Sequence, residues 1–480
     1  MDKPNILIFM TDQQRGDTVL PGTPAKMPNV EAFRKEGVLF SEAHCPSPHC
    51  CPSRATFFTG LQPSEHNVWH NVDVSNAISR GLAEKVVTWS EDLKENGYRL
   101  YFAGKWHVSA VESPANRGWD PAGGNFPEQS GHRRDWWKIY SKLDERPDGY
   151  LRREGEIIRP GYPNYIHYGT HENPFGDLDV VRAAQKRIEK LSDTADPWVV
   201  YAGTLGPHDP YFVPQRFLDR YPLEEIELPA NFRDDFTHRP NLYDRTRGMF
   251  DQLTETEHRQ AIRHYLAFCS YEDWLFGELL TSLQESGQAD NTLVIYLSDH
   301  GDYMGEHGLW CKGLPCFKGA YHIPCIMRWP AGISQPGRSV DSFIGLDDFA
   351  PTLLELAGLK TDRRFSGRSL VPFLKNEDPA GWRSAYYTQS NGNELYGIQR
   401  SVTTSQFKLV YNGFDFDELY DLRDDPHEMN NVIDRPVNAL VVKELYRKLW
   451  TFAKENDDSC INPYIMVGLA KYGPGLGVSQ

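Results

Sequence analysis

Cysteine is scarce in this chain, with eight residues among 480. So sparse a set excludes the disulfide framework that stabilises small secreted domains. Three of the eight, Cys311, Cys316 and Cys325, lie close together in the sequence but lack the paired C-x-x-C spacing of structural zinc sites. We therefore interpret these three residues as buried thiols.

Long apolar runs and an excess of basic residues are absent as well. No apolar stretch approaches the roughly 20 residues that a membrane-spanning helix needs, so we expect no membrane partner. The net charge of −15 argues against nucleic acid as a partner. Because the same negative field repels small anions, an anionic substrate would need a locally basic pocket.

The first residues, 1–5, lead directly into an apolar segment without the basic region, long apolar core and cleavage site of a secretory signal. This start predicts a cytoplasmic protein, or a periplasmic one if a leader has been removed. The sequence does not separate these two locations. It also leaves open whether the chain forms a homo-oligomer.

Apolar runs alternate with amphipathic segments over most of the chain. Such runs are typical of strands covered on both faces, and the segments between them have helical spacing. The expected strands are 5–10, 38–40, 98–103, 198–202 and 291–297, and the expected helices are 28–37, 86–96, 177–191, 254–284 and 346–358. This alternation predicts an α/β fold with a large, mostly parallel sheet sandwiched by helices.

The pattern changes near residue 384. We assign residues 1–383 to a catalytic α/β domain, and 384–480 to a smaller C-terminal α+β subdomain with short strands within 408–422 and a final helix at 441–454. Residues 108–175 show little periodicity, so we expect long loops over the active face. In these loops Trp136 and Trp137 fit a sugar-stacking platform and a lid anchor equally well.

Polar side chains follow each of the four long apolar runs. The ends of parallel strands in an open α/β sheet are where ligands bind, so neighbouring strands would bring these side chains to one edge. Carboxylate and amide oxygens suit Ca²⁺ or Mg²⁺, whereas an imidazole suits zinc or manganese better, so the spacing does not fix the metal. In chain order these side chains are Asp12 and Gln13, Lys105 and His107, His208, and Asp299 and His300.

The segment 49–60 places a nucleophile beside an anion-binding group. Pro52 suits the first turn of a helix, which Gly60 closes. Cys50 would then lie just before the helix N-terminus, where free N–H groups lower a thiol pKa. Arg54 adds a fork of donors suited to a tetrahedral oxyanion.

Residues 50–54, Cys-Cys-Pro-Ser-Arg, resemble the C-x-P-S-R signature of type I sulfatases, the formylglycine-dependent branch of the alkaline phosphatase superfamily. The resemblance implies an alkaline-phosphatase-like fold. It also implies that a formylglycine-generating enzyme oxidises Cys50 to formylglycine (3-oxoalanine), whose hydrated aldehyde is the nucleophile. Only Cys50 has Pro two residues and Arg four residues further on.

Further family elements follow in order along the chain. Residues 104–107, Gly-Lys-Trp-His, are similar to the sulfatase G-K-W-H element, residues 206–210 to its P-H-x-P/F loop and residues 298–312 to its second metal segment with a catalytic lysine. Segments 346–358 and 418–426 resemble later signatures. The resemblance implies catalytic roles for Cys50, Arg54, Lys105, His107, His208 and Lys312.

The resemblance further implies a Ca²⁺ site, with Mg²⁺ or Mn²⁺ as alternatives, whose ligands are Asp12, Gln13, residue 50, Asp299 and His300. Arg54, Lys105 and Lys312 would hold the sulfate oxygens. His208, with Lys312, would protonate the leaving alcohol, and His107 would take a proton from residue 50. Expected substrate contacts are Asn71, Trp310 and His70.

Departures from the pattern of many sulfatases indicate which branch of the family this chain resembles. Gln13 and His300 replace an Asp and an Asn of many sulfatases and, with Asn71, resemble choline-sulfatases and phosphonate monoester hydrolases. The hydrolase branch lacks the G-K-W-H element, and the presence of this element here favours a sulfate ester as substrate. The ester could belong to a small molecule or to an oligosaccharide. We expect a sulfated carbohydrate as substrate, with phosphonate monoester or phosphodiester hydrolysis as the alternative. A third alternative, a non-enzymatic glycan-binding relative, is disfavoured because the set of reactive residues is intact.

Overall fold

The computed structural model describes residues 3–123, 151–159, 165–393, 395–462 and 469–477. Trp136 and Trp137, the expected stacking platform or lid anchor, lie outside the described residues. Within the described parts of the chain, no helix combines the length and the apolar character that crossing a bilayer requires.

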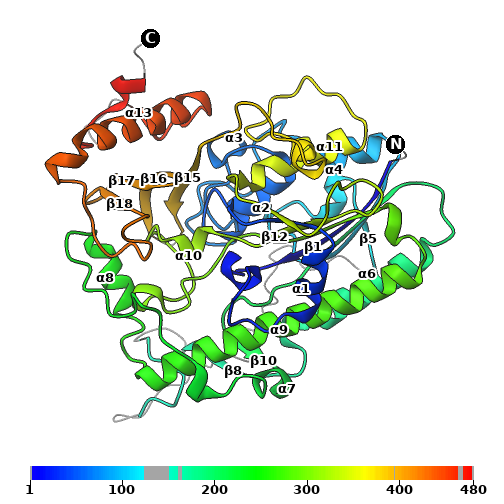
Figure 1. The fold of residues 1–480 in the computed structure, drawn as a ribbon, viewed down its shortest axis with the longest axis horizontal. Helices are drawn as coiled ribbons and strands as arrows, with labels where there is room; N and C mark the ends of the chain where they lie inside the picture. Colours follow the sequence, from blue (N-terminus) through cyan, green and yellow to red (C-terminus); the bar gives the residue numbers. More distant parts are fainter. Residues whose placement is uncertain (1–2, 124–150, 160–164, 394, 463–468, 478–480) are drawn as a thin grey trace.

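An eight-stranded sheet forms the centre of the molecule (Figure 1). Strands β11, β1, β9, β4 and β5 are parallel neighbours, while β12 runs antiparallel to both β11 and β2. The order across the sheet is β13 (Arg338–Val340), β2 (Val38–Phe40), β12 (Cys325–Arg328), β11 (Thr292–Ser298), β1 (Asn5–Thr11), β9 (Trp198–Gly203), β4 (Arg99–Gly104) and β5 (Asp120–Pro121). The expected α/β fold with a mostly parallel sheet is confirmed.

Helices cover both faces of this sheet, and each face has its own core (Figure 1). Side chains of β1 alternate between the two cores: Ile6, Ile8 and Met10 enter one, and Leu7 and Phe9 enter the other. The first core includes residues of α2 (Cys50–Thr59), α4 (Trp89–Glu95) and α11 (Phe349–Leu356). The second includes residues of α1 (Pro28–Lys35), α6 (Asp177–Lys190) and α9 (Glu255–Glu285).

Capping residues set where two of these helices begin. Helix α9 starts after Thr254, whose backbone N–H donates to Glu257 across 2.8 Å in the capping box that the sequence predicts. Helix α4 starts at Trp89, three residues later than expected, because Thr88 and Glu91 form a second capping box. Sequence reasoning missed that signal.

The expectation of loops throughout 108–175 is wrong in part. The described residues of this segment include short strands that sequence periodicity cannot show, because each has only two or three residues. Strand β8 (Tyr168–Thr170) pairs with β10 (Tyr211–Val213), which follows the segment carrying His208. The other short strands are β5, β6 (Glu156–Ile157) and β7 (Tyr165–Ile166).

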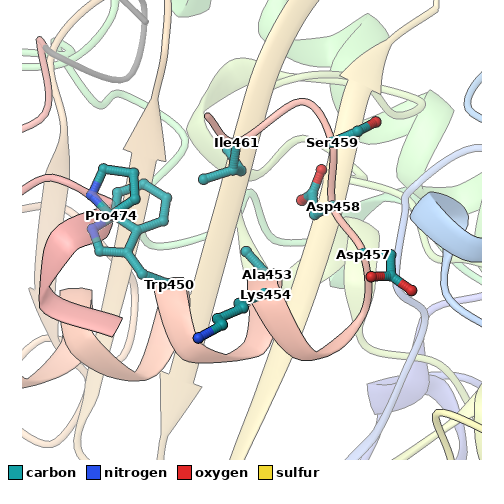
Figure 2. A pocket seen from close by; sticks show the side chains of 8 residues that line it. All are labelled: Trp450, Ala453, Lys454, Asp457, Asp458, Ser459, Ile461 and Pro474. Carbon is teal, nitrogen blue, oxygen red and sulfur yellow. The ribbon is translucent and has the colours of Figure 1, made fainter. Parts of the chain in front are cut away.

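The C-terminal part is a four-stranded antiparallel sheet covered by helix α13 (Ala439–Glu455) (Figure 1). Helix α13 and the residues that follow it line an open pocket of about 450 Å³ (Figure 2). Asp458, one of the lining residues, forms a buried ion pair with Arg400. The strands are β15 (Ala385–Gly392), β16 (Tyr396–Thr404), β17 (Phe407–Asn412) and β18 (Glu418–Asp421). The smaller C-terminal subdomain is therefore present, and the boundary at 383/384 stays a prediction.

Helix α2 is the most enclosed of the helices near the sheet edge, since all ten of its residues are buried. The centroid of its Phe58 ring lies 4.7 Å from the ring centroid of Trp106 and 5.7 Å from that of Tyr201. We predict that Phe58→Ala lowers the free energy of unfolding by about 3–5 kcal/mol, because it leaves a cavity in this aromatic cluster. Urea denaturation measures the change.

The matched control is Leu440→Ala, since Leu440 is 82% exposed on α13. This variant should stay within about 0.5 kcal/mol of the wild type. A loss below about 1 kcal/mol for Phe58→Ala would contradict the close packing of α2.

Candidate active site

Four parallel strands deliver their polar ends to one edge of the sheet. In the order β11, β1, β9, β4, each strand is hydrogen-bonded to the next. Thr11 pairs with Ser298 at the ends of β1 and β11, so Asp12 and Asp299 leave the sheet side by side. Lys105 directly follows β4, and its N–H donates to Gly203 at the end of β9 across 2.9 Å.

Helix α2 presents its N-terminus to this edge. Cys50 is the first residue of the helix rather than the residue before it, and His49 occupies the N-cap position. Gly60 ends the helix with a left-handed φ of 71°, and its N–H donates to Thr56 across 2.8 Å. The short helix thus fixes Cys50 and, one turn later, Arg54.

Four potential ligand atoms surround one point at the sheet edge. Cys50 Sγ lies 3.2 Å from His300 Nε2 and 3.8 Å from Asp12 Oδ1. His300 Nε2 lies 3.7 Å from Asp12 Oδ1 and 3.7 Å from Asp299 Oδ1. All four atoms lie within 4.8 Å of one another, and all four residues are buried.

Arg54 holds the opposite oxygens of the two carboxylates. Its Nε donates to Asp299 Oδ2 across 2.7 Å, and its Nη2 donates to Asp12 Oδ2 across 3.0 Å. Lys105 Nζ also donates to Asp12 Oδ2, across 2.5 Å. These bonds leave both Oδ1 atoms facing His300, so Arg54 orients the carboxylates here. Its expected contact with sulfate oxygens stays a prediction.

The hydrogen bonding of His300 prepares its ring for a metal. His300 Nδ1 donates to the carbonyl oxygen of Gly301 across 2.9 Å, so Nε2, which faces the carboxylates, is the ring nitrogen that would bind a metal once it has lost its proton. Two carboxylate oxygens and an imidazole nitrogen therefore converge from buried side chains. This donor set fits a divalent cation.

Nearby cations offset the cost of burying these anions. Burial alone would raise the pKa of the Cys50 thiol, but Lys105, Lys312 and His300 hold it well below its usual range. Burial and the Cys50 thiolate would raise the pKa of the Asp12 carboxyl. Lys105 and the other nearby cations outweigh both effects, so the pKa of Asp12 is well below its usual value. The cluster therefore favours an anionic group at residue 50.

His208 and Lys312 form a second pair beside the cluster. Lys312 Nζ donates to His208 Nε2 across 2.8 Å, and His208 Nδ1 donates to the carbonyl oxygen of Asp209 across 2.5 Å. His208 Nε2 lies 3.9 Å from Asp12 Oδ1. The pair therefore adjoins the four ligand atoms, as the proton-donor role expected of it requires.

Gln13 connects this pair to two further acids. Its Oε1 accepts from Lys312, and its Nε2 donates to Asp209 across 3.1 Å and to Asp302 across 2.5 Å. The carboxamide is thus engaged away from the four converging atoms. Its expected role as a metal ligand gains no support from these contacts and stays a prediction.

The other expected residues lie at different distances from the cluster. His107 is hydrogen-bonded to Cys50, and its Nε2 lies 3.1 Å from Asp73 Oδ1. Asn71 Oδ1 accepts from the Cys51 N–H across 3.2 Å, so both residues adjoin α2. The His70 ring packs edge-on against Tyr396, with 4.9 Å between centroids.

Trp310 lies in the protein core. Only 1% of the residue is exposed, and its indole N–H donates to His258 Nδ1 across 2.9 Å. This packing gives no support to a contact between Trp310 and substrate.

Sequence reasoning missed several residues that complete the site. Asp209 and Asp302 stand next to expected residues in polar runs, which is a signal that could have identified them. Tyr201, whose hydroxyl accepts from Arg54 Nη1 across 2.9 Å, lies within an apolar strand and gave no signal. Asp73 lies far from His107 in sequence, so only the fold reveals that they meet.

Comparison with known proteins assigns the family. A model of the sulfatase family matches residues 4–359, and a model described as N-sulphoglucosamine sulphohydrolase, C-terminal, matches residues 305–455. The chain belongs to the sulfatase family. It is therefore a sulfuric ester hydrolase, as the sequence predicted.

One sequence relative is itself named a sulfatase, and two solved structures share the fold of this chain. A choline-sulfatase of Rhizobium meliloti (strain 1021) is 29% identical over 461 residues, covering 90% of this chain and 83% of the relative. The structure of a protein in complex with its substrate D-glucosamine-2-N,6-O-disulfate superposes with a TM-score of 0.73 at 23% identity, over 95% of this chain and 99% of that chain. The structure of the phosphonate monoester hydrolase of Agrobacterium radiobacter superposes with a TM-score of 0.76 at 24% identity, over 94% of this chain and 96% of that chain.

A buried pair of acids, Asp177 and Glu272, supports the segment that carries His208. Asp177 accepts from the N–H groups of Leu205 and Gly206 across 2.9 and 2.8 Å. A Cβ at Gly206 would lie 2.2 Å from Glu272 Oε1, so the loop packs directly on this acid. Burial raises the pKa of Asp177 to about 7, and burial together with Asp177 raises the pKa of Glu272 well above its usual value. Burial and the neighbouring acid therefore favour the neutral form of Glu272.

We predict that Glu272→Gln makes stability less dependent on pH. Because the folded-state pKa of Glu272 is raised, its contribution is fully present below the unfolded pKa and is lost as pH rises through the folded value. The wild type should thus lose more stability than Glu272→Gln between about pH 5 and about pH 8 in urea denaturation.

Glu278→Gln, on the exposed face of the same helix, is the matched control and should keep the wild-type slope. An unchanged slope in Glu272→Gln would mean that Glu272 is ionised in the folded protein.

Proposed function

We propose that this sulfatase hydrolyses the sulfate ester of a carbohydrate, using formylglycine formed from Cys50 and a divalent cation. The observation that supports this most strongly is the convergence of Cys50 Sγ, Asp12 Oδ1, Asp299 Oδ1 and His300 Nε2 within 4.8 Å of one another. A formylglycine-generating enzyme would act on residues 50–54 before the chain reaches its active form.

The cation would lie between the Oδ1 atoms of Asp12 and Asp299, His300 Nε2 and residue 50. It is Ca²⁺ in this proposal, with Mg²⁺ or Mn²⁺ as alternatives, and when bound it supplies the positive charge that makes the hydrated aldehyde more acidic. Arg54 keeps both carboxylates in place through their Oδ2 atoms.

The remaining cations bind the ester and move protons. Lys105 and Lys312 lie close enough to residue 50 to lower its pKa, so they can also attract the sulfate oxygens. In this proposal Lys312, whose Nζ donates to His208 Nε2 across 2.8 Å, passes a proton to that nitrogen, and His208 delivers it from Nε2 to the leaving alcohol. His107, held by Asp73, accepts the proton that leaves residue 50.

A carbohydrate substrate is supported by the similar structure that holds a disulfated glucosamine. In this proposal Asn71 and His70 contact the sugar, since Asn71 adjoins the first turn of α2. Phosphonate monoester hydrolysis is the alternative, because the phosphonate monoester hydrolase structure superposes equally well.

Defined substrates separate these possibilities. A panel of sulfated mono- and disaccharides, choline sulfate, an aryl sulfate and an aryl phosphonate monoester should show the highest kcat/KM for one of the sugars. Highest kcat/KM for the phosphonate ester would favour the alternative. Turnover of choline sulfate alone would retain the sulfatase and overturn the carbohydrate assignment.

We predict that Cys50→Ala abolishes turnover, because Ala provides neither an aldehyde precursor nor a ligand atom. The loss should exceed about a thousandfold, as expected when a covalent nucleophile is removed. Mass spectrometry of the peptide containing residue 50 should show the aldehyde in the wild type and in Cys51→Ser, the matched control at the neighbouring position. Full activity in a preparation whose Cys50 is entirely a thiol would overturn the proposed nucleophile.

A further inference from the structure

A second group of potential metal ligands lies beside α2, which contributes one of them. Cys51 Sγ, a carboxylate oxygen of Asp73 and a ring nitrogen of His107 all lie within 4.8 Å of one another. None of the three is among the four potential ligands around Cys50, and His107 connects the two groups through its hydrogen bond with Cys50. Sulfur, nitrogen and oxygen donors therefore meet at a point that the proposed hydrolysis does not use for a metal.

We propose that Cys51, Asp73 and His107 form an inhibitory site for Zn²⁺. Zinc in proteins is bound by thiolate, imidazole and carboxylate ligands, often three of them with a fourth position open to water. Calcium prefers six or more oxygen ligands, so this group is a poor calcium site. The chemistry of the donors thus distinguishes this site from the oxygen-rich site proposed beside it.

The spacing suits a tetrahedral ion after a small adjustment. Zinc–ligand bonds of about 2.0–2.3 Å place tetrahedral ligands roughly 3.5 Å apart. His107 Nε2 and Asp73 Oδ1 are already 3.1 Å apart, and the sulfur lies within 4.8 Å of the other two ligand atoms. An inward shift of about 1 Å by Cys51 or by the exposed Asp73 would complete the site.

The surroundings provide a route for the ion and a hydrogen-bond donor for the bound sulfur, whereas burial raises the pKa of the free Cys51 thiol. The Asp73 side chain is 32% exposed, whereas that of His107 is fully buried, so zinc would enter from the side of Asp73. Cys51 Sγ accepts a hydrogen bond from the Val72 N–H across 3.3 Å. Such a donor stabilises a metal-bound thiolate. Binding forms a Zn–S bond and releases the thiol proton to solvent.

Zinc at this site would block His107. With zinc on Nε2, the neutral His107 ring carries its own proton on Nδ1, so neither nitrogen can accept the proton that leaves residue 50. This consequence rests on the role proposed for His107, whereas binding itself depends only on the three ligands. Binding and inhibition can therefore be tested separately.

Binding is tested with Co²⁺ as a spectroscopic substitute for zinc. The full-length Cys50→Ala protein is used because residue 50 then offers no thiol, and excess Ca²⁺ is added to occupy the oxygen-rich site. A thiolate-to-cobalt charge-transfer band should appear and disappear when Zn²⁺ is added in equimolar amount. The band should be lost in Cys50→Ala/Cys51→Ser and retained in Cys50→Ala/Cys311→Ser, the control for an unrelated thiol.

Absence of the band, or its persistence without Cys51, would overturn the proposed site. Cys51→Ser and Cys51→Ala are compared so that a folding defect in one does not decide the result. In addition, Asp73→Asn should weaken zinc binding by at least about tenfold, the range found when groups that support a metal are altered. These binding measurements test the proposed zinc site even if the protein turns over no sulfate ester.

Inhibition is tested on the calcium-loaded wild type with its best substrate. Micromolar Zn²⁺ should reduce kcat in the wild type, and Cys51→Ser should keep the basal activity and lose the zinc sensitivity. If the cobalt band depends on Cys51 but Cys51→Ser is inhibited as strongly as the wild type, zinc binds there without controlling His107, and the inhibitory part of the proposal is overturned.

Discussion

The arrangement of the active site depends on one buried guanidinium placed between two carboxylates. Arg54, Asp12 and Asp299 have no exposed side-chain surface, so water cannot compensate any of these charges. Removing one partner from such a buried set typically costs about 3–5 kcal/mol. Because Arg54 occupies the Oδ2 atoms, the Oδ1 atoms have to face His300 and residue 50. The ion pairs that stabilise the fold thus also aim the ligands.

Backbone conformations at the strand ends complete this arrangement. Gln13 and His107 have left-handed φ angles of 65° and 51°, which side-chain-bearing residues rarely adopt. Gly104 has a φ of 88°, and a Cβ there would lie 1.9 Å from the Gly203 carbonyl oxygen, so only glycine allows β4 to approach β9 at this point. The sharp turns after the strands bring Lys105 and His107 back over the sheet edge.

Much of this fold could be predicted from the sequence because its signals are local. Continuous apolar runs predicted the central strands, and polar residues directly after them predicted where a site would form. Paired contacts between distant segments could not be predicted in this way. The bonds from Arg54 to Tyr201 and from Gln13 to Asp302 depend on register and on side-chain direction. Short strands such as β8 depend on a partner, β10, which is distant in sequence. The role expected for Trp310 illustrates the same limit, since proximity to Lys312 in the sequence did not place its ring at the site.

Adjacent residues of α2 serve different groups because successive helical side chains point about 100° apart. Cys50 faces His300 and Asp12, while Cys51 faces the Val72 N–H and the group with His107. In the unmodified chain both groups contain a thiol and would favour soft metals. Under the proposed function, oxidation replaces sulfur by oxygen at residue 50 alone. That single change would make the first group a hard, oxygen-rich site and leave the second one soft. The modification that creates the nucleophile would then also determine which metal each group prefers.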